Sequence, residues 1–509
     1  MQAQDGILKP IWVENQKPLT FPAPTAADTA EVIVVGGGIS GVTTAYVLAK
    51  QGKKVLLVDE GPIGSGQTHR TSAHLASIID DRFSVIEKEH DVEFSKLAHQ
   101  SHSAAIDFIE RVSGEEKIDC EFARLNAYLF RGPDDKSDTL EKEFDAAGRA
   151  GVSDLEWVVS PGDGALTGKA IRFGGQGIFH PMKYLRGLTL AAENLGVVFR
   201  TGDRVMDTSG KTKDQPPTAT FASGLKLTCE AIVVATNTPT PINDWLSIYL
   251  KQAAYRTYMV GLAVENEFSV PNALYWDTTD PYHYVRLEKM DDRTVLLVGG
   301  EDHKTGQDHP DDGRFERLTR WAKEVFPSAG EEVYRWSGQV QEPSDGLGVV
   351  GVAPTKGENV YVITGDSGMG LTHGTLGALL VTDLILGREN PWAKIYDPKR
   401  FLMNTEALKE DLNANAQYVD YLTRGDIKSP ADLKPGEGGL MRSGLKKIAV
   451  YKTDEGKVCQ FSAVCPHLGG IVQWNPVEKT WDCPVHGSHF DCEGKLLIGP
   501  STDDLPPVG

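Results

Sequence analysis

A strand, a glycine-rich turn and a helix are the first elements that the pattern of apolar positions predicts. The apolar run from Val32 to Val35 indicates a buried strand, and glycines follow it directly. Val42, Ala45 and Leu48 then recur at helical spacing, and the run from Lys53 to Val58 indicates a second strand. Strand, helix and strand in this order form a βαβ unit, so we expect a parallel sheet with helices on both sides.

The middle of the chain, between residues 90 and 340, mixes helical and strand-like patterns. Phe94 to Arg111 shows helical spacing, whereas Ile171 to Phe179 and Thr294 to Gly300 alternate as strands do. Further along, the apolar run VYVITG at 360–365 leads into a glycine turn and an apolar helix, whose N-terminus is expected to face a nucleotide.

The pattern changes again past residue 390. A charged helical stretch from Pro398 to about Leu422 leads to a segment rich in Pro and Gly, Lys428 to Gly439. Short strand-like runs with turn signals between them follow, at Lys446 to Tyr451, Val458 to Phe461 and Leu496 to Ile498. We therefore expect a large domain over residues 1–400, a helical linker over 401–426 and a small antiparallel β domain over 427–509.

Length and charge narrow the possibilities further. A chain of 509 residues exceeds the size of one hydrophobic core, so two or three domains are expected. The formal net charge of −19 disfavours nucleic acid and anionic membrane surfaces as partners. The N-terminus shows no signal peptide, no apolar run approaches the roughly 20 residues of a membrane span, and six cysteines do not resemble a secreted disulfide framework. We expect a cytoplasmic protein, and the sequence indicates no particular oligomeric state.

Two short loops near the C-terminus carry metal-binding residue types. Cys465 and His467 form a C-x-H loop, and Cys483 and His486 form a C-x-x-H loop after 15 intervening residues. A Rieske centre needs one Cys and one His from each of two loops, because two thiolates hold one iron and two imidazoles hold the other. A Cys2His2 zinc site and a chance pairing of core residues are the alternatives. Zinc sites of that composition usually group the two Cys and the two His, so the alternation favours the iron–sulfur cluster.

The remaining cysteines and a nearby histidine are not expected to bind the metal. His489 follows the second loop, but a third imidazole has no place in the cluster, so a solvent-facing or packing role is expected. Small buried hydrophobic residues are expected at Cys120, Cys229, Cys459 and Cys492.

A dinucleotide fingerprint lies in the first βαβ unit. Gly36, Gly38 and Gly41 stand in G-x-G-x-x-G spacing between strand and helix, and Asp59 ends the next strand. Such glycines let backbone N–H groups approach a pyrophosphate, and the acid can hydrogen-bond a ribose. The second copy of the pattern, at 346–351, is predicted to be a turn, because Pro354 and a glycine after it prevent a following helix. One fingerprint argues against a reductase with separate FAD and NAD folds.

The stretch from Ile427 to Leu505 resembles Rieske domains, because CPHLGG and CPVHGSHFD match the two family loops. Respiratory members carry an extra Cys in each loop that forms a disulfide. Gly470 and Val485 stand at those positions, so the disulfide is absent. Ser488 matches a serine that hydrogen-bonds the cluster and Phe490 replaces a tyrosine that does the same, so we expect a midpoint between the ferredoxin-like and respiratory extremes.

Residues 31 to about 400 resemble the D-amino-acid-oxidase superfamily of FAD enzymes. The resemblance rests on VIVVGGGISGVTTAYVLAKQGKKVLLVDEG, GSGQTHRTSAHL, AIVVATNTP and TGDSGMGLTHG. It implies an α/β FAD-binding domain of Rossmann-like, glutathione-reductase type with an α+β substrate domain at about 90–340, followed by the small all-β Rieske domain. His69 or His74 stays open as a covalent flavin attachment point. The cofactor residues that the resemblance implies are Gly36, Gly38, Ile39, Ser40, Gly41, Asp59, Glu60, Gly66, Thr68, Thr71, Ser72, Ala73, His74, Arg204, Val205, Thr236, Gly365, Gly368, Met369, Gly370, Leu371 and Thr372.

Candidate substrate residues gather in YWDTTDPYHYVRL, a strand and turn at 275–287. Arg286 is a candidate for pairing with a substrate carboxylate, and aromatic rings there are candidates for packing on an amine. An ordinary aromatic strand with an exposed Arg is the alternative. The candidate catalytic residues are Trp276, His283, Tyr284, Arg286 and His373, with Tyr258 as a weaker candidate.

The expected function follows from both resemblances. Relatives of the FAD module take a hydride from a carbon next to an amine nitrogen. We expect a dehydrogenase that oxidises a small amine or amino-acid derivative and passes single electrons through the Rieske cluster, by an exposed edge at His467 and His486, to an external protein or quinone-like acceptor. The alternatives are an electron-transfer component that serves an oxygenase without an organic substrate, and a redox sensor with a vestigial flavin site.

Overall fold

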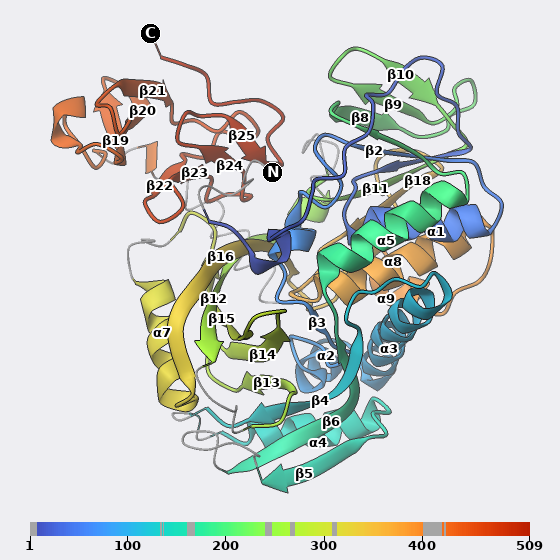
Figure 1. Ribbon diagram of the computed structural model, residues 1–509. Coiled ribbons are helices and arrows are strands. Elements are labelled where there is room, and N and C mark those ends of the chain that lie inside the picture. The colour runs from blue at the N-terminus through green and yellow to red at the C-terminus, as the bar shows by residue number, and fades with distance from the viewer. Residues whose placement is uncertain are drawn as a thin grey trace.

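The computed structural model describes residues 8–132, 135, 137–159, 168–239, 247–264, 270–307, 313–400, 420–421 and 424–508. Two large sheets form the body of the molecule, and a small β domain built from the C-terminal residues lies against one end of the second sheet (Figure 1). Most of the charged stretch expected at 398–422, and most of the linker expected at 401–426, lie outside the described residues.

The first sheet has six strands and contains the predicted βαβ unit. Its strands are parallel except β17, which runs antiparallel to β18. The order is β17 (Val349–Val352), β18 (Val360–Thr364), β11 (Ala231–Asn237), β1 (Val32–Val35), β2 (Val55–Asp59) and β7 (Val198–Thr201). The helices that pack near it are α1 (Ile39–Lys50), α3 (Val92–Glu115), α5 (Pro181–Asn194), α8 (Gly370–Ile385) and α9 (Ala393–Tyr396).

Among the described residues, the helices named above pack on one face of this sheet and a small antiparallel sheet covers most of the other, which corrects the expectation of helices on both sides. Alternate residues of a strand point to opposite faces. Val32 and Val34 pack with the helices, whereas Ile33 and Val35 share a core with Phe221 and other residues of a small antiparallel sheet. That sheet consists of β8 (Val205–Ser209), β9 (Thr218–Phe221) and β10 (Lys226–Thr228).

The second sheet has nine strands, which come from the part of the sequence between residues 74 and 343. Helix α7 (Arg314–Val325) packs on β12, β15 and β16, while α2 (Phe83–Glu89) packs against α3 and α4 (Thr139–Arg149). The strand order is β16 (Ala329–Pro343), β12 (Gln252–Val264), β15 (Thr294–Lys304), β14 (His283–Lys289), β13 (Leu274–Asp277), β4 (Ala123–Phe130), β6 (Lys169–Ile178) and β3 (His74–Leu75), with β5 (Leu155–Val159) paired to β6.

The second glycine pattern at 346–351 opens no helix, as predicted. Its last residues belong to β17, and its glycines serve packing. A side chain at Gly348 would overlap the ring of His373, so this glycine makes room for a histidine from α8.

The C-terminal domain contains two small antiparallel sheets, which confirms the prediction of an all-β unit. The first consists of β19 (Gly438–Ser443), β20 (Lys446–Lys452) and β21 (Val458–Ser462). The second consists of β22 (Gln473–Asn475), β23 (Thr480–Asp482), β24 (His489–Asp491) and β25 (Leu496–Ile498). Short 3-10 helices lie at Ile11–Val13, Gln67–Arg70 and Pro430–Asp432.

Candidate cofactor cavity and metal site

A cavity of about 320 Å³ lies between the two large sheets. Most residues expected along the dinucleotide line it, whereas Gly41, Ala73, Gly365 and Thr372 are not among its lining residues. The expected residues that line it are Gly36, Gly38, Ile39, Ser40, Asp59, Glu60, Gly66, Thr68, Thr71, Ser72, His74, Arg204, Val205, Thr236, Gly368, Met369, Gly370 and Leu371.

The glycine turn at the start of α1 has no room for side chains. Gly36 has a φ of +110°, and an added Cβ there would lie 2.5 Å from the carbonyl oxygen of Ala235. An added Cβ at Gly41 would overlap the carbonyl oxygen of Gly36. The turn therefore places bare backbone and the N-terminus of α1 at the cavity, which fits a dinucleotide pyrophosphate.

Two polar side chains hold this turn in place. Asp59 accepts hydrogen bonds from the backbone N–H groups of Gly37 (2.5 Å) and Gly61 (2.7 Å), and burial raises its pKa to about 7. The Thr68 hydroxyl accepts from the N–H of Ile39 at 3.0 Å. Both residues also line the cavity, so they hold the turn in place and border the volume that a ligand would occupy.

Only one of the two histidines considered for covalent attachment lines the cavity. His74 does so, and its Nδ1 lies 2.9 Å from the hydroxyl of Ser72. Burial, with a smaller effect from Arg286, lowers the pKa of His74 to about 3. His69 is directed to the carbonyl of Gly64, with its Nδ1 at 2.9 Å, and is not part of the cavity wall.

The candidate catalytic residues divide into two groups. Trp276, Tyr284 and His373 line the cavity. Burial lowers the pKa of His373 to about 4, and its Nε2 lies 3.0 Å from the carbonyl oxygen of Thr364. His373 is therefore a neutral residue of the wall at pH 7.

His283 and Arg286 do not reach the cavity. The His283 ring stacks on Trp321 with centroids 4.0 Å apart, and its Nδ1 lies 2.8 Å from a carboxylate oxygen of Asp277. Arg286 is buried, pairs with Glu288 and donates to the carbonyl of Ala73 at 2.9 Å. The structure thus corrects the idea that Arg286 binds a substrate carboxylate, and equally the alternative of an exposed Arg. Tyr258 is also buried away from the cavity.

A group of carboxylates, none of which the sequence analysis singled out, lines the cavity beyond the tyrosines. The Tyr282 hydroxyl donates to Asp80 at 2.7 Å. Burial is the main cause that raises the pKa of Asp80 to about 7 and of Asp302 and Asp366 to about 6, and it raises the pKa of Glu342 well above its usual range. These four acids come from loops and strands far apart in the chain, so no local pattern marks them.

The positive charges of the wall are few. Arg204 lies at the dinucleotide end, where it pairs with Glu60. Arg70 donates to the carbonyl of Ser337 at 3.1 Å, and the charge of Arg82 faces Asp80 and Glu143. No lysine is among the described residues that line the cavity, so carboxylates outnumber cations in its wall.

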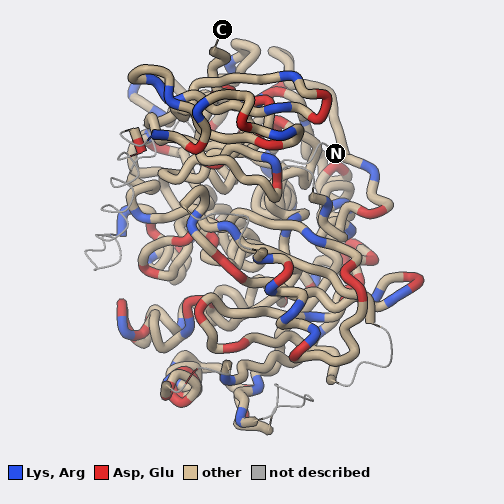
Figure 2. Tube along the Cα trace, turned by 90° about the vertical axis from the view of Figure 1, so that its left-hand side faces the viewer, with Lys and Arg blue, Asp and Glu red and all other residues tan. Residues whose placement is uncertain are grey.

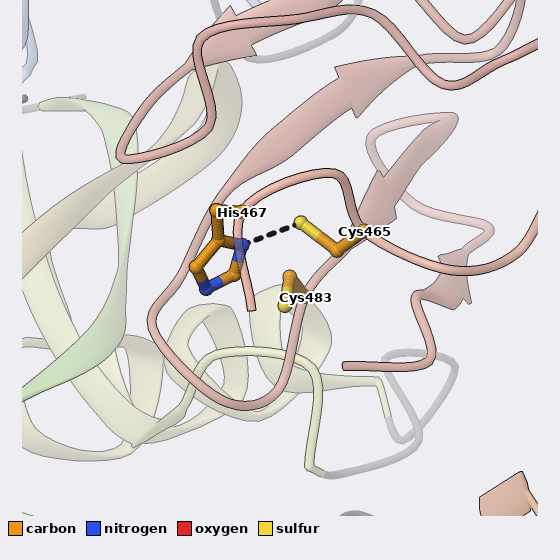
Figure 3. A group of neighbouring side chains, drawn as sticks. All are labelled: Cys465, His467 and Cys483. Carbon is orange, nitrogen blue, oxygen red and sulfur yellow. Dashed lines mark hydrogen bonds between the residues drawn. The ribbon is translucent and has the colours of Figure 1, made fainter. Parts of the chain in front are cut away.

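Three of the four predicted metal ligands, Cys465, His467 and Cys483, converge in the C-terminal domain (Figure 3). Ligand atoms of Cys465, His467 and Cys483 all lie within 4.8 Å of one another, and His467 Nε2 lies 2.9 Å from His486 Nδ1. Burial lowers the pKa of His467 to about 3 and of His486 to about 4. Both imidazoles are therefore neutral at pH 7, which is the form that binds metal.

Both parts of the chain match known family models. Residues 31–384 match the model described as DAO, FAD dependent oxidoreductase, and residues 424–508 match the Rieske [2Fe-2S] domain. The chain belongs to the DAO family of FAD dependent oxidoreductases. Its DAO domain binds FAD, and its Rieske domain binds a [2Fe-2S] cluster.

Similar proteins share all or part of this architecture. The Rieske 2Fe-2S iron-sulfur protein YhfW of Bacillus subtilis is 27% identical over 98% of this chain and 97% of its own length. Gamma-glutamylputrescine oxidoreductase of Escherichia coli is 24% identical over 70% of this chain and 84% of its own length. Among solved structures, glycine oxidase from Geobacillus kaustophilus superimposes with a TM-score of 0.61 and 19% identity, covering 74% of this chain and 99% of that one, which shows a shared fold.

The His486 half of the expected histidine edge is covered, which corrects the expectation of exposure for that residue but not for His467. His486 is 9% exposed, and its ring lies 5.6 Å from that of Tyr249 of the DAO domain. His467 is partly exposed. The following residue, Leu468, packs against the core between the six-stranded sheet and the small sheet of β8, β9 and β10. The His486 side of the site therefore faces the DAO domain.

The Rieske domain also helps to close the flavin cavity. Its residues Leu497, Ile498, Gly499 and Ser501 line the cavity, and Arg204 donates to the carbonyl of Thr502 at 3.3 Å. Sequence motifs give no sign of this contribution, because these residues belong to a short strand and loop without a cofactor pattern.

The two cluster loops differ from those of respiratory Rieske proteins at the positions that the sequence indicated. An added Cβ at Gly470 would lie 3.3 Å from the Cβ of Val485 and 3.0 Å from Cys483 Sγ, so the two positions face each other without thiols. Phe490 is buried. His489 is fully buried and contacts Asp482 at 2.8 Å, so it packs in the core and does not face solvent.

Ser488 is expected to raise the reduction potential of the cluster. Its hydroxyl accepts from the N–H of Ser501 at 3.0 Å. Burial holds the pKa of Cys465 well above its usual range, and a hydrogen bond from Ser488 acts to lower that pKa. A hydrogen bond to a charged group is worth roughly 1.5–3 kcal/mol, which corresponds to about 60–130 mV for one electron. Redox titration of Ser488→Ala should give a lower midpoint by this amount, and Phe490→Tyr should change it upward. An unchanged midpoint in Ser488→Ala would mean that the hydroxyl does not act on the cluster.

Lys and Arg alternate with Asp and Glu along the trace in Figure 2, and no large basic patch stands out on it. Within the described part of the chain, no helix has both the length and the apolar character that crossing a bilayer requires.

Proposed function

We propose that this protein is an amine dehydrogenase whose electrons leave singly through the Rieske cluster to an external one-electron acceptor. One observation carries the proposal: a single cavity joins the dinucleotide-binding turn to an end lined by tyrosines and carboxylates. When bound, FAD would supply a hydride acceptor, and the cluster would supply a one-electron carrier.

The cavity wall favours a cationic substrate. Asp80, Asp302 and Asp366, once ionised, are positioned to attract an ammonium group, and Trp276 and Tyr284 offer aromatic faces on which a cation can pack. A substrate carboxylate would be repelled by the same acids, and Arg286 is paired elsewhere. Amines without a carboxylate near the reacting carbon are therefore favoured over simple amino acids.

The position of the Rieske domain supports a dehydrogenase over an oxidase. The loop that carries Cys483 and His486 packs on strands β12 and β16, which also form part of the cavity wall. Since sheets pack about 10 Å apart, one layer of protein separates the cavity from that loop. Electrons in the cavity thus have a short route to the cluster.

Anaerobic incubation with a panel of compounds tests the proposal. Diamines and monoamines should bleach the flavin absorbance of the holoprotein, amino acids should do so poorly, and NADH should not do so. Bleaching by NADH alone would refute the amine dehydrogenase and favour an electron-transfer component.

Amine oxidation is expected to depend on the ionisation of the cavity acids. The raised pKa values mean that Asp80, Asp302 and Asp366 are largely protonated below about pH 6 and ionise as the pH rises through 6–7. A neutral carboxyl does not attract a cation, so KM for an amine should fall roughly tenfold between pH 5 and 8. Steady-state kinetics across this range measure the change.

Variants at Asp302 give the control for this pH dependence. Asp302→Asn should raise KM at pH 8 and flatten the profile, whereas Asp302→Glu keeps a carboxyl group and should retain most of the dependence. A profile in which KM rises with pH would contradict binding of a cation by these acids.

A further inference from the structure

Strands β12 and β16 form a single-layer partition between the flavin cavity and the Rieske domain. Thr257, Gly338 and Val340 line the cavity, whereas the side chains of Arg256 and Gln339 contact the Rieske domain. Alternate residues of paired strands point to opposite faces, and Arg256 pairs directly with Gln339 in the register. The same two strands thus carry one wall for each cofactor site.

Gln339 is the residue of this partition that touches both sides. It lines the cavity, and its backbone N–H donates to the side chain of Gln67, another cavity residue, at 2.9 Å. Its side-chain Nε2 donates to the carbonyl oxygen of Gly487 at 3.1 Å. The residue is 3% exposed, and among the described residues its Oε1 has no hydrogen-bond partner.

Gly487 follows the cluster ligand His486 directly, and its backbone packs closely against strands β12 and β16. Its φ is +78°, and an added Cβ would overlap Ala254 of β12 and the amide of Gln339. A second glutamine supports the same loop, because Gln307 donates to the carbonyl of Pro484 at 2.9 Å. The loop from residue 484 to 487 is therefore held against the sheet at both of its ends.

We propose that Gln339 is a positioning residue for electron transfer, which fixes the His486 side of the cluster against the wall of the flavin cavity. This inference rests on the proposed function. With both cofactors bound, the two electrons of reduced FAD would cross the partition one at a time. An external one-electron acceptor protein would take each electron from the cluster in turn, so two acceptors would be reduced for each flavin, and the flavin's protons would pass to solvent.

Gln339 holds the cluster loop through its hydrogen bond to the carbonyl oxygen of Gly487. Gln339→Glu keeps the size of the side chain but replaces the N–H donor by an acceptor that faces a carbonyl oxygen. Gln339→Leu removes the polar group altogether. Both variants should loosen the cluster loop from the partition while leaving all four cluster ligands in place.

The experiment uses the holoprotein without any substrate. A light flash in the presence of EDTA reduces the flavin, and absorbance and low-temperature paramagnetic resonance then follow the electron to the cluster. In both Gln339 variants the cluster should be reduced roughly tenfold to 100-fold more slowly than in the wild type, the loss typical of removing a partner that supports a metal ligand. Iron content and the shape of the cluster signal should not change.

Gln341→Leu is the matched control. Gln341 lies two residues along the same strand, and among the described residues its Nε2 has no hydrogen-bond partner. This variant should reduce its cluster at the wild-type rate. Equal rates in all variants, or an equal slowing in Gln341→Leu, would overturn the role of Gln339. A wild-type cluster that stays oxidised beside a reduced flavin would instead show that the proposed function is wrong, whatever Gln339 does.

Discussion

Replacing Glu478 with glutamine is expected to destabilise the docked Rieske domain by about 3–5 kcal/mol, the usual cost of removing one partner of a buried ion pair. Arg256 and Glu478 form such a pair between β12 and the turn before β23, with side chains 1% and 0% exposed. Ser337 also donates to Glu478, and Asn475 donates to it at 3.2 Å. Without the carboxylate, the charge of Arg256 stays buried in the interface.

Chemical unfolding followed by two signals measures this effect. Flavin fluorescence reports on the DAO domain and visible circular dichroism on the cluster, so separation of the two transitions would reveal undocking. The control is Lys479→Gln, which removes the partly exposed pair Lys479–Asp454 at 3.9 Å and should change stability by less than about 1 kcal/mol. A double variant, Arg256→Met with Glu478→Leu, should recover most of the loss. Equal stability of Glu478→Gln and Lys479→Gln would contradict a role of the pair in docking.

The parts of the site that the sequence predicts are those built from nearby residues. Gly36, Gly38 and Gly41 lie within one turn, and their spacing alone dictates bare backbone at the N-terminus of α1. The four cluster ligands lie within 22 residues, on two loops of one small domain. For such local constellations spacing is enough, because the chemistry requires residue types at fixed short intervals.

The errors at the substrate end also have a physical origin. His283 and Tyr284 are neighbours on β14, so they point to opposite faces of the strand, and only Tyr284 reaches the cavity. Arg286 shares the face of Tyr284 but lies further along the strand, beneath the carbonyl of Ala73. Closeness in sequence was the reason for grouping these residues, and alternation along the strand separates them.

The cavity acids were out of reach of any sequence pattern. Asp80 follows β3, Asp302 lies in β15, and Glu342 lies near the end of β16, so the nine-stranded sheet alone brings them together. Their raised pKa values arise from burial beside one another, which is a property of the fold and not of any segment. The docking of the Rieske domain on β12 and β16 cannot be predicted from a sequence pattern for the same reason, because Gln339 and Gly487 are 148 residues apart in the sequence.

Replacing Cys483 with serine is expected to remove the cluster completely. Cys483 is fully buried between the two loops, and a cluster that loses one of four ligands lacks the thiolate that binds its iron. The rhombic paramagnetic signal and the iron content should both disappear, while FAD should still bind, because the glycine turn and Asp59 belong to the other domain. Cys459→Ser is the matched control, because Cys459 is a free, partly buried cysteine in the same domain and its variant should keep a full cluster.

The kinetic consequence of Cys483→Ser separates a dehydrogenase from an oxidase. An amine should still bleach the flavin, since the cavity acids and tyrosines remain in place. Turnover with a one-electron acceptor should fall by roughly 100-fold or more, the upper range for damage to a metal site, because the route across β12 and β16 then ends at an empty loop. Rapid reoxidation of the reduced flavin by oxygen in this variant, at the rate of the wild-type enzyme, would show that the cluster is dispensable and that the protein works as an oxidase. Zinc in place of iron in the wild-type protein would remove the proposed electron route altogether.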